Sequence, residues 1–154
     1  MDMTVEEREQ KASDLFKAGY NCCQAVAMTF ADVLGLPEDE VARLTSGFGG
    51  GMGRMREVCG TVSAMTMVAG KLIPADDVNN KGAKTANYAL VQEMAGEFRQ
   101  QTGSILCREL LGLSKPEGTH VPSDRTPEYY KKRPCAELCS IAAGIAARKL
   151  KSQE

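Results

Sequence analysis

The fold of this chain depends on the stretch Gly47-Phe48-Gly49-Gly50-Gly51-Met52-Gly53-Arg54-Met55-Arg56-Glu57-Val58-Cys59-Gly60. Five of the 15 glycines lie between positions 47 and 53. Glycine accepts positive φ angles and lets backbone approach backbone closely, so this run predicts a tight turn. A largely apolar segment follows, and we expect it to form a helix from about Glu57 to Leu72. The turn would therefore deliver Cys59 to the N-terminus of that helix.

Helical spacing of apolar residues continues on both sides of this turn, and no segment shows the alternation typical of a strand. Turn signals at Gly35, Gly47, Pro74 and Gly103 separate the segments. We expect helices over 4–18, 22–34, 37–46, 57–72, 80–101, 104–111 and 134–150, with one more turn starting at Thr126-Pro127. The helix from about Glu57 should be central, packed between those that start near Asn21 and Asn80. The sequence thus predicts one all-α domain over 1–154, a helical bundle of about six to eight helices.

The composition excludes several classes of function. With 19 basic and 20 acidic residues the formal net charge is −1, which attracts neither nucleic acid nor an anionic membrane. No tryptophan is present, and aromatic residues make up 5% of the chain, so base-stacking surfaces are not expected. The N-terminus is polar and acidic, unlike a signal peptide, and no apolar run is long enough to span a bilayer. We therefore expect a cytoplasmic protein, where six cysteines are typical of metal ligands or catalytic thiols.

Four of the expected helices begin with a cysteine. Cys22 follows the N-cap residue Asn21, Cys59 follows the glycine turn, Cys107 lies three residues after Ser104, and Cys135 follows Pro134. The N-terminus of a helix offers unpaired N–H groups and positive potential, which favour the thiolate and lower the pKa of a cysteine. The alternative is that these cysteines pack in the core as small apolar residues.

Two further cysteines lie beside members of this set: Cys23 is adjacent to Cys22, and Cys139 is one helical turn after Cys135. Neither local pair is well placed for a disulfide, so a bond between helices, such as Cys22 with Cys59, is expected instead. There is no Cys-x-x-Cys, which excludes a thioredoxin-type site and a zinc ribbon. The roles of Cys23 and Cys139 stay open.

The glycine turn is also a candidate binding site for an anion. Backbone N–H groups of Gly49, Gly50 and Gly51, together with the side chain of Arg54, could surround a negative group. The alternative is a tight connection between helices that holds no ligand. His120 is the only histidine and lies in a polar loop, where a solvated side chain is expected.

At this point the chain resembles a known family. The residues that carry the likeness are Gly19-Tyr20-Asn21-Cys22, the glycine run 47–53, Val58-Cys59-Gly60-Thr61-Val62-Ser63, Gly103-Ser104-Ile105-Leu106-Cys107-Arg108-Glu109-Leu110-Leu111-Gly112, and Cys135. Together they resemble the redox-active protein family named C_GCAxxG_C_C. The four cysteines of that name correspond to Cys22, Cys59, Cys107 and Cys135. Where the family's central motif usually closes with glycine, this chain has Ser63 or Ala64.

The resemblance implies a helical domain with a redox role. Members are similar to a region of split-Soret cytochromes, which carry an iron–sulfur centre as well as haem. The haem attachment motif Cys-x-x-Cys-His is missing here, so the resemblance implies only the iron–sulfur centre for this chain and not the haem.

Three functions follow. In the first, Cys22, Cys59, Cys107 and Cys135 form one thiolate site that holds an iron–sulfur cluster or zinc, for electron transfer to an unknown redox partner. In the second, the thiols form a disulfide relay or sensor without metal. In the third, the chain is a non-enzymatic helical interaction module. An oxidoreductase or an electron-transfer protein fits the first two functions, and a homo-oligomer is compatible with all three.

Overall fold

The computed structural model describes residues 3–113 and 119–153. The helices are α1 (Val5–Lys17), α2 (Cys22–Thr29), α3 (Ala31–Leu34), α4 (Glu38–Thr45), α5 (Gly60–Leu72), α6 (Lys81–Thr102), α7 (Cys107–Leu110), α8 (Pro127–Lys132) and α9 (Cys135–Ser152), with a 3₁₀ turn at Ser46–Phe48. Over these ranges the chain forms no strand, only one isolated antiparallel bridge between Val58 and Leu106. The predicted all-α fold is confirmed. The described residues contain one helix more than expected because the predicted helix over 22–34 divides into α2 and α3, whereas α7 and α8 correspond to the short helix and the turn expected near 104–111 and Thr126.

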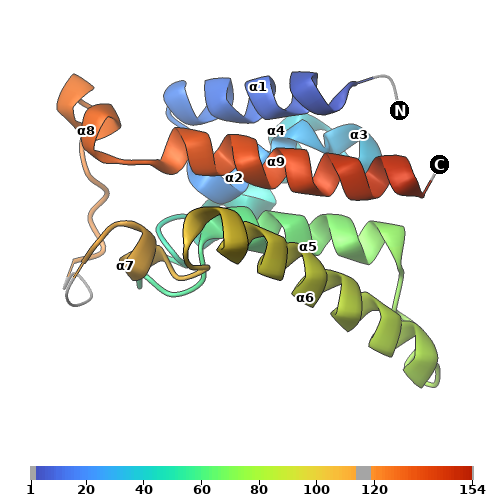
Figure 1. The fold of residues 1–154 in the computed structure, drawn as a ribbon. Coiled ribbons are helices and arrows are strands. Elements are labelled where there is room, and N and C mark those ends of the chain that lie inside the picture. Colours follow the sequence, from blue (N-terminus) through green and yellow to red (C-terminus); the bar gives the residue numbers. More distant parts are fainter. Residues whose placement is uncertain (1–2, 114–118, 154) are drawn as a thin grey trace.

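The helices pack in layers around one apolar core. In Figure 1, α1 lies along α9, and α5 and α6 form a layer beneath them. Helix α5 contacts α2 on one side and α6 on the other, as predicted, and α9 covers a further side. The largest buried apolar side chains of this core are Phe16, Val26, Phe30, Val41, Met65, Val68, Met94, Phe98 and Ile145.

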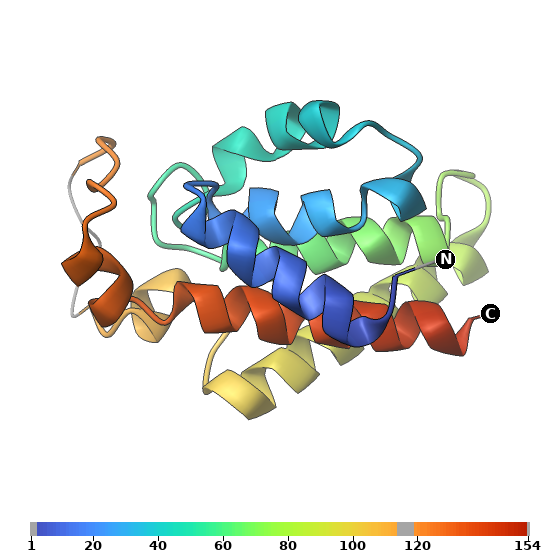
Figure 2. The same cartoon turned by 90° about the horizontal axis from the view of Figure 1, so that it is seen from above.

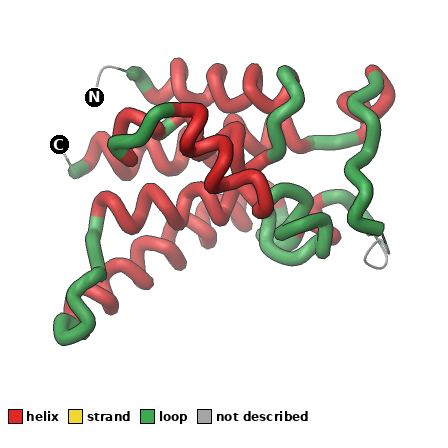
Figure 3. The backbone as a smooth tube through the Cα atoms, turned by 180° about the vertical axis from the view of Figure 1, so that it is seen from behind, coloured by secondary structure: helices red, strands yellow, loops and turns green. Residues whose placement is uncertain are grey.

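Helices α2, α5 and α9 begin at the same end of the molecule. Figures 1 and 2 show this end beside α7 and α8, whereas both chain termini lie at the opposite end. Seen from behind in Figure 3, most of the long loops also gather there. The N-terminal, positive ends of three helix dipoles therefore meet at one place. We refer to it below as the cysteine end.

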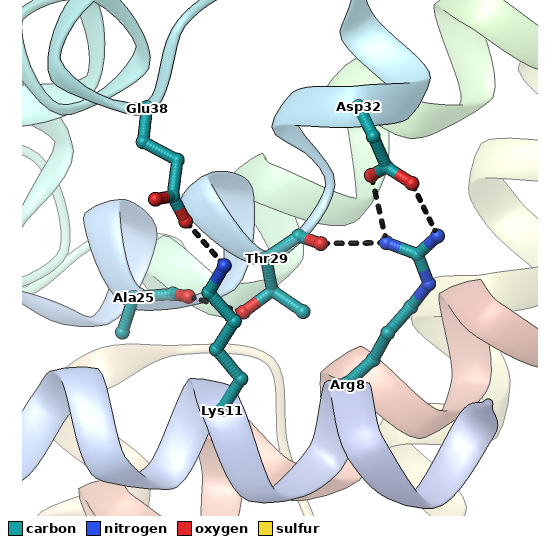
Figure 4. Close-up of polar contacts among 6 residues, drawn as sticks. All are labelled: Arg8, Lys11, Ala25, Thr29, Asp32 and Glu38. Carbon is teal, nitrogen blue, oxygen red and sulfur yellow. Dashed lines mark hydrogen bonds and ion pairs between the residues drawn. The ribbon is translucent and has the colours of Figure 1, made fainter. Parts of the chain in front are cut away.

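The predicted helix over 22–34 is wrong in one respect, because the chain breaks at Phe30 into α2 and α3. The guanidinium of Arg8, on α1, donates to the carbonyl oxygen of Thr29 at 2.6 Å and to both carboxylate oxygens of Asp32 at 3.0 and 2.9 Å (Figure 4). Arg8 is only 1% exposed, and such a buried cation needs partners of this kind. Its hydrogen bond satisfies the carbonyl oxygen of Thr29, which has no helical N–H donor because the helix is interrupted at Phe30. Lys11 makes a second link from α1, to Glu38.

The central helix begins at Gly60 rather than near Glu57. Arg56 has a left-handed φ of 60°, and Cys59 has φ −55° and ψ 134°, so the chain is not helical before Gly60. Residues 57–59 instead run alongside 105–107: the N–H of Cys59 donates to the carbonyl of Ile105 at 2.8 Å. The N–H of Cys107 donates to the carbonyl of Glu57 at 2.7 Å. This pairing replaces the first turn that we expected.

Candidate redox site

A cavity of about 390 Å³ opens at the cysteine end. Its lining includes all four cysteines singled out by the sequence, namely Cys22, Cys59, Cys107 and Cys135, whereas Cys23 and Cys139 do not line it. The four residues come from α2, the start of α5, α7 and α9. The tertiary structure thus brings together four thiols that are separated by as many as 113 positions in the chain.

Each of these cysteines stands at the start of a helix, as predicted. Cys22, Cys107 and Cys135 are the first residues of α2, α7 and α9, and Cys59 occupies the N-cap position of α5. The predicted cap Asn21 is present: its side chain accepts from the N–H of Gln24 at 2.9 Å. Ser104, where we expected the helix over 104–111 to begin, does not cap α7. Its hydroxyl accepts from the N–H of Leu106, which holds the approach to α7, and α7 itself spans only Cys107–Leu110.

The glycine run lets the backbone approach the thiols. Gly51 has φ 71°, and a Cβ atom there would lie 2.7 Å from Cβ of Cys107 and 2.6 Å from the backbone nitrogen of Glu57. Such distances leave no room for a side chain. Non-glycine residues with left-handed φ alternate with the glycines, namely Met52, Arg54 and Arg56. Several such residues in one loop store strain that the surrounding hydrogen bonds must hold.

The Cys22 thiol lies among other sulfurs, because Cys135, Cys139 and Cys59 each shift its pKa. The Cys139 thiol also lies 4.0 Å from the carbonyl oxygen of Cys22. The expected bond between helices, such as Cys22 with Cys59, stays a prediction. All six cysteines are free thiols in this structure.

The predicted lowering of the cysteine pKa values is not found. Burial raises the pKa of Cys59 to about 11 and that of Cys23 to about 12, and burial also raises the pKa of Cys107 and Cys139. The hydrogen bond to Cys22, followed by burial, raises the pKa of Cys135. For Cys22, the hydrogen bond with Cys135 lowers the pKa, but Cys139, burial and neighbouring sulfurs together raise it well above its usual range. Desolvation and mutual repulsion thus outweigh the helix dipoles, and the thiols are protonated at neutral pH.

Arginines counter part of this effect. The Arg56 guanidinium donates to the sulfur of Cys107 at 3.5 Å, which lowers the pKa of that thiol against the larger effect of burial. The positive charges of Arg133 and Arg125 lower the pKa of Cys135, against the larger effects of Cys22 and burial. Among the described residues that line the cavity there are four arginines, at 54, 56, 125 and 133, and neither aspartate nor glutamate.

Sequence reasoning missed Arg125 and Arg133. Arg125 lies in the loop before α8, and its guanidinium donates to the carbonyls of Phe16 and Tyr20 at 2.9 and 3.0 Å. These partners are more than 100 positions away in the chain, and no local pattern points to such a contact. His120, which we expected in solvent, is exposed but does line the cavity.

The candidate anion site lies at the same cavity. Gly49, Gly50, Gly51 and Arg54 all line it. Arg54 donates to the carbonyl oxygen of Val121 and to the hydroxyl of Ser123, so this side chain ties the glycine loop to residues 119–123. Anion binding by the glycine run stays a prediction.

A metal centre is not evident in the arrangement of these groups. Over residues 3–113 and 119–153, no three or more cysteine, histidine, aspartate or glutamate side chains are placed so as to hold a metal ion. The four cavity thiols are soft donors of the kind that zinc and iron prefer, but their present positions do not form such a group. None of the described helices combines the length and the apolar character needed to cross a membrane.

Comparison with known proteins agrees with the motifs. Residues 20–149 match the family model described as "Putative redox-active protein (C_GCAxxG_C_C)". The chain belongs to the C_GCAxxG_C_C family. A search of curated proteins and a search of solved structures each gave no match. The match to the C_GCAxxG_C_C family includes all six cysteines and the glycine turn, so it covers the whole lining of the cavity apart from Phe16.

Proposed function

We propose that this protein is a thiol–disulfide redox protein whose reacting pair is Cys22 and Cys135. The observation that carries the proposal is that both thiols line one cavity, where each shifts the pKa of the other. Cys22 is partly exposed and lines the cavity, whereas Cys135 lines the same cavity but is buried. A partly exposed thiol beside a buried one suits an attacking cysteine and a resolving cysteine.

The step transfers two electrons. In the reduced state both residues are thiols, and in the oxidised state one S–S bond joins Cys22 to Cys135. The two electrons and two protons that the pair loses pass to a disulfide acceptor, which leaves as two thiols. No metal is needed for this exchange.

The raised pKa values indicate the direction in which the pair works. A dithiol becomes a strong oxidant when its reduced form is stabilised as thiolate, which requires low pKa values. Here burial and neighbouring sulfurs raise the pKa of both Cys22 and Cys135, so the thiolate is not stabilised. The disulfide state is favoured correspondingly, and we infer that the reduced protein acts as a reductant.

Titration in dithiothreitol buffers of defined reduction potential tests this function. Alkylation followed by peptide mass spectrometry locates the disulfide that forms. The expected result is a single two-electron transition that joins Cys22 to Cys135. Cys22→Ser and Cys135→Ser should abolish it, and Cys23→Ser should retain it because Cys23 does not line the cavity. A bond that omits either Cys22 or Cys135, or no bond at any poise, would contradict the proposal.

A second candidate is the metal or iron–sulfur centre for electron transfer that the family resemblance implies. Its support is that Cys22, Cys59, Cys107 and Cys135 share one cavity and that nearby arginines would favour an anionic cluster. The donor chemistry fits zinc or iron, but the sulfurs would have to move closer together, so we derive no step through a metal. Anaerobic purification with metal analysis and a visible spectrum tests it. A colourless, metal-free protein that still forms the disulfide would exclude this candidate.

A further inference from the structure

The arginine-lined mouth of the cavity points to the class of substrate. We propose that the protein reduces small disulfides that carry carboxylates, with Arg125 binding a carboxylate while Cys22 attacks the S–S bond. This inference rests on the proposed thiol–disulfide function and adds the identity of the electron acceptor. It is carried by the position and contacts of Arg125.

Arg125 is held in place by neutral groups. Its guanidinium bonds the carbonyls of Phe16 and Tyr20 and lies 4.4 Å from the ring centre of Phe16 and 4.9 Å from that of Tyr129. Carbonyls and rings orient the guanidinium but do not neutralise its charge. These hydrogen bonds and ring contacts also hold the guanidinium of Arg125 in one orientation, which lowers the entropy lost when a carboxylate binds.

The surroundings add to this positive field. Arg54, Arg56 and Arg133 line the same cavity, and the described part of its lining contains no carboxylate. Positive side chains on a cavity wall raise the local concentration of anionic ligands. Because Arg125 and Arg133 both act electrostatically on Cys135, the field reaches the reacting sulfurs.

The size and walls of the cavity favour a small molecule over a protein partner. A volume of about 390 Å³ lies in the range typical of small-molecule sites. Phe16, Leu110, Tyr129 and Leu138 provide apolar wall area that suits methylene and sulfur groups. A short dicarboxylate disulfide presents both features, an apolar middle and anionic ends.

The reaction balances without another reagent. Cys22 gives up its proton as its sulfur attacks one sulfur of the bound disulfide, and the other half of the disulfide leaves and takes up that proton. Cys135 then attacks the sulfur of Cys22 in this mixed disulfide, and the second half leaves with the proton of Cys135. The protein ends with a Cys22–Cys135 bond, and the substrate ends as two thiols with two added electrons.

Three disulfides of similar size and different charge test the substrate class: 3,3′-dithiodipropionate, bis(2-hydroxyethyl) disulfide and cystamine. The rate at which each oxidises the reduced protein is divided by its rate with 2-mercaptoethanol, which removes differences in intrinsic reactivity. At low ionic strength we expect the dicarboxylate to exceed the neutral compound by about tenfold, with cystamine slowest. Added salt should reduce this spread.

Variants identify the residue responsible. Arg125→Gln should remove most of the advantage of the dicarboxylate over the neutral compound, and Arg125→Lys should retain part of it. Arg148→Gln is the matched control, because Arg148 is exposed on α9, 13 residues beyond Cys135, and does not line the cavity. If Arg125→Gln does not fold, the substrate class is tested by the wild-type protein alone, through the order of its normalised rates with the three disulfides and the effect of salt on them.

The outcomes separate the two proposals. Equal normalised rates for the three compounds, or a fastest rate with cystamine, would overturn the substrate class while the redox function stands. If none of the three produces the Cys22–Cys135 bond, the redox function itself fails and the substrate class fails with it.

Discussion

The two ends of this molecule are built differently. Away from the cysteine end, α1, α9 and the α2–α3 junction pack through small or fully buried side chains, such as Ala142, Ala143 and Phe30. At the cysteine end, short helices and loops surround a cavity that contains strained backbone and thiols with raised pKa values. The comparison suggests that the first end supplies most of the stability and the second the chemistry. Four predictions test this assignment of stability to one end and chemistry to the other.

The largest effect is expected in the core. Phe30 is fully buried between α2 and α3, with the Arg8 guanidinium 4.7 Å from its ring centre. Phe30→Ala should lower the free energy of unfolding by about 3–5 kcal/mol, through lost burial and the cavity left behind. Urea unfolding measures this, with Tyr88→Ala as an exposed control. A loss below about 1 kcal/mol, or a changed rate of thiol oxidation in the folded variant, would contradict the division.

The second effect concerns the glycine turn. Gly51→Ala combines a left-handed φ with a clash against Cys107, and should cost roughly 2–4 kcal/mol. Gly53→Ala is the matched control, since Gly53 also has positive φ but its added Cβ meets no atom within 4 Å, so it should cost about 1–2 kcal/mol. Unfolding curves and the alkylation rate of Cys107 distinguish the two. Equal losses would mean that close approach to Cys107 is unimportant.

The third prediction concerns alkaline pH. A thiol whose folded pKa exceeds its unfolded value stabilises the protein below the unfolded pKa, and that stability is lost as pH rises toward the folded pKa. Unfolded cysteine titrates near 8.5, whereas the pKa of folded Cys23 is raised to about 12. Under reducing conditions, stability should therefore fall above pH 8.5. In Cys23→Ala the fall should be shallower by about 1.4 kcal/mol per pH unit. Identical slopes in both proteins would contradict the raised pKa.

The smallest effect is expected at Asp32, back at the α2–α3 junction. The hydrogen bond from Arg8 lowers the pKa of this carboxylate, so it stabilises the fold above its unfolded pKa and that contribution is lost on acidification. Because Asp32 is 42% exposed, we expect Asp32→Asn to cost only about 1 kcal/mol at pH 7. Stability should also fall less in this variant between pH 5 and 3. Asp76→Asn, at an exposed loop position, should behave as wild type.

Much of the helical fold could be predicted because its signals are local. Thr4, Asn21 and Thr126 each accept a backbone N–H three residues ahead, as capping residues do, and their identity alone marked helix starts. The break at Phe30 could not be predicted, because no local signal opposes a continuous helix there. The Arg8 bond that meets the freed Thr29 carbonyl comes from 21 residues earlier in the chain.

The candidate site was likewise predictable only where its features depend on neighbouring residues. That Cys22, Cys59, Cys107 and Cys135 start helices was predictable from neighbouring residues, since caps, prolines and glycines act within a turn or two. The pairing of residues 57–59 with 105–107 was not, because each segment is too short to show a strand pattern. Cys22 and Cys135 line one cavity because α2 and α9 pack together, and that packing joins segments more than 100 positions apart.

By itself, the sequence determined the helical class, the glycine turn and the placement of four cysteines at helix N-termini. These features depend on backbone propensity and on side chains a few positions apart. The tertiary structure decided which thiols touch, that their pKa values rise rather than fall, and that Arg125 faces the cavity. Burial and long-range contact set these properties, because desolvation and charge interactions depend on neighbours that only the folded chain brings together.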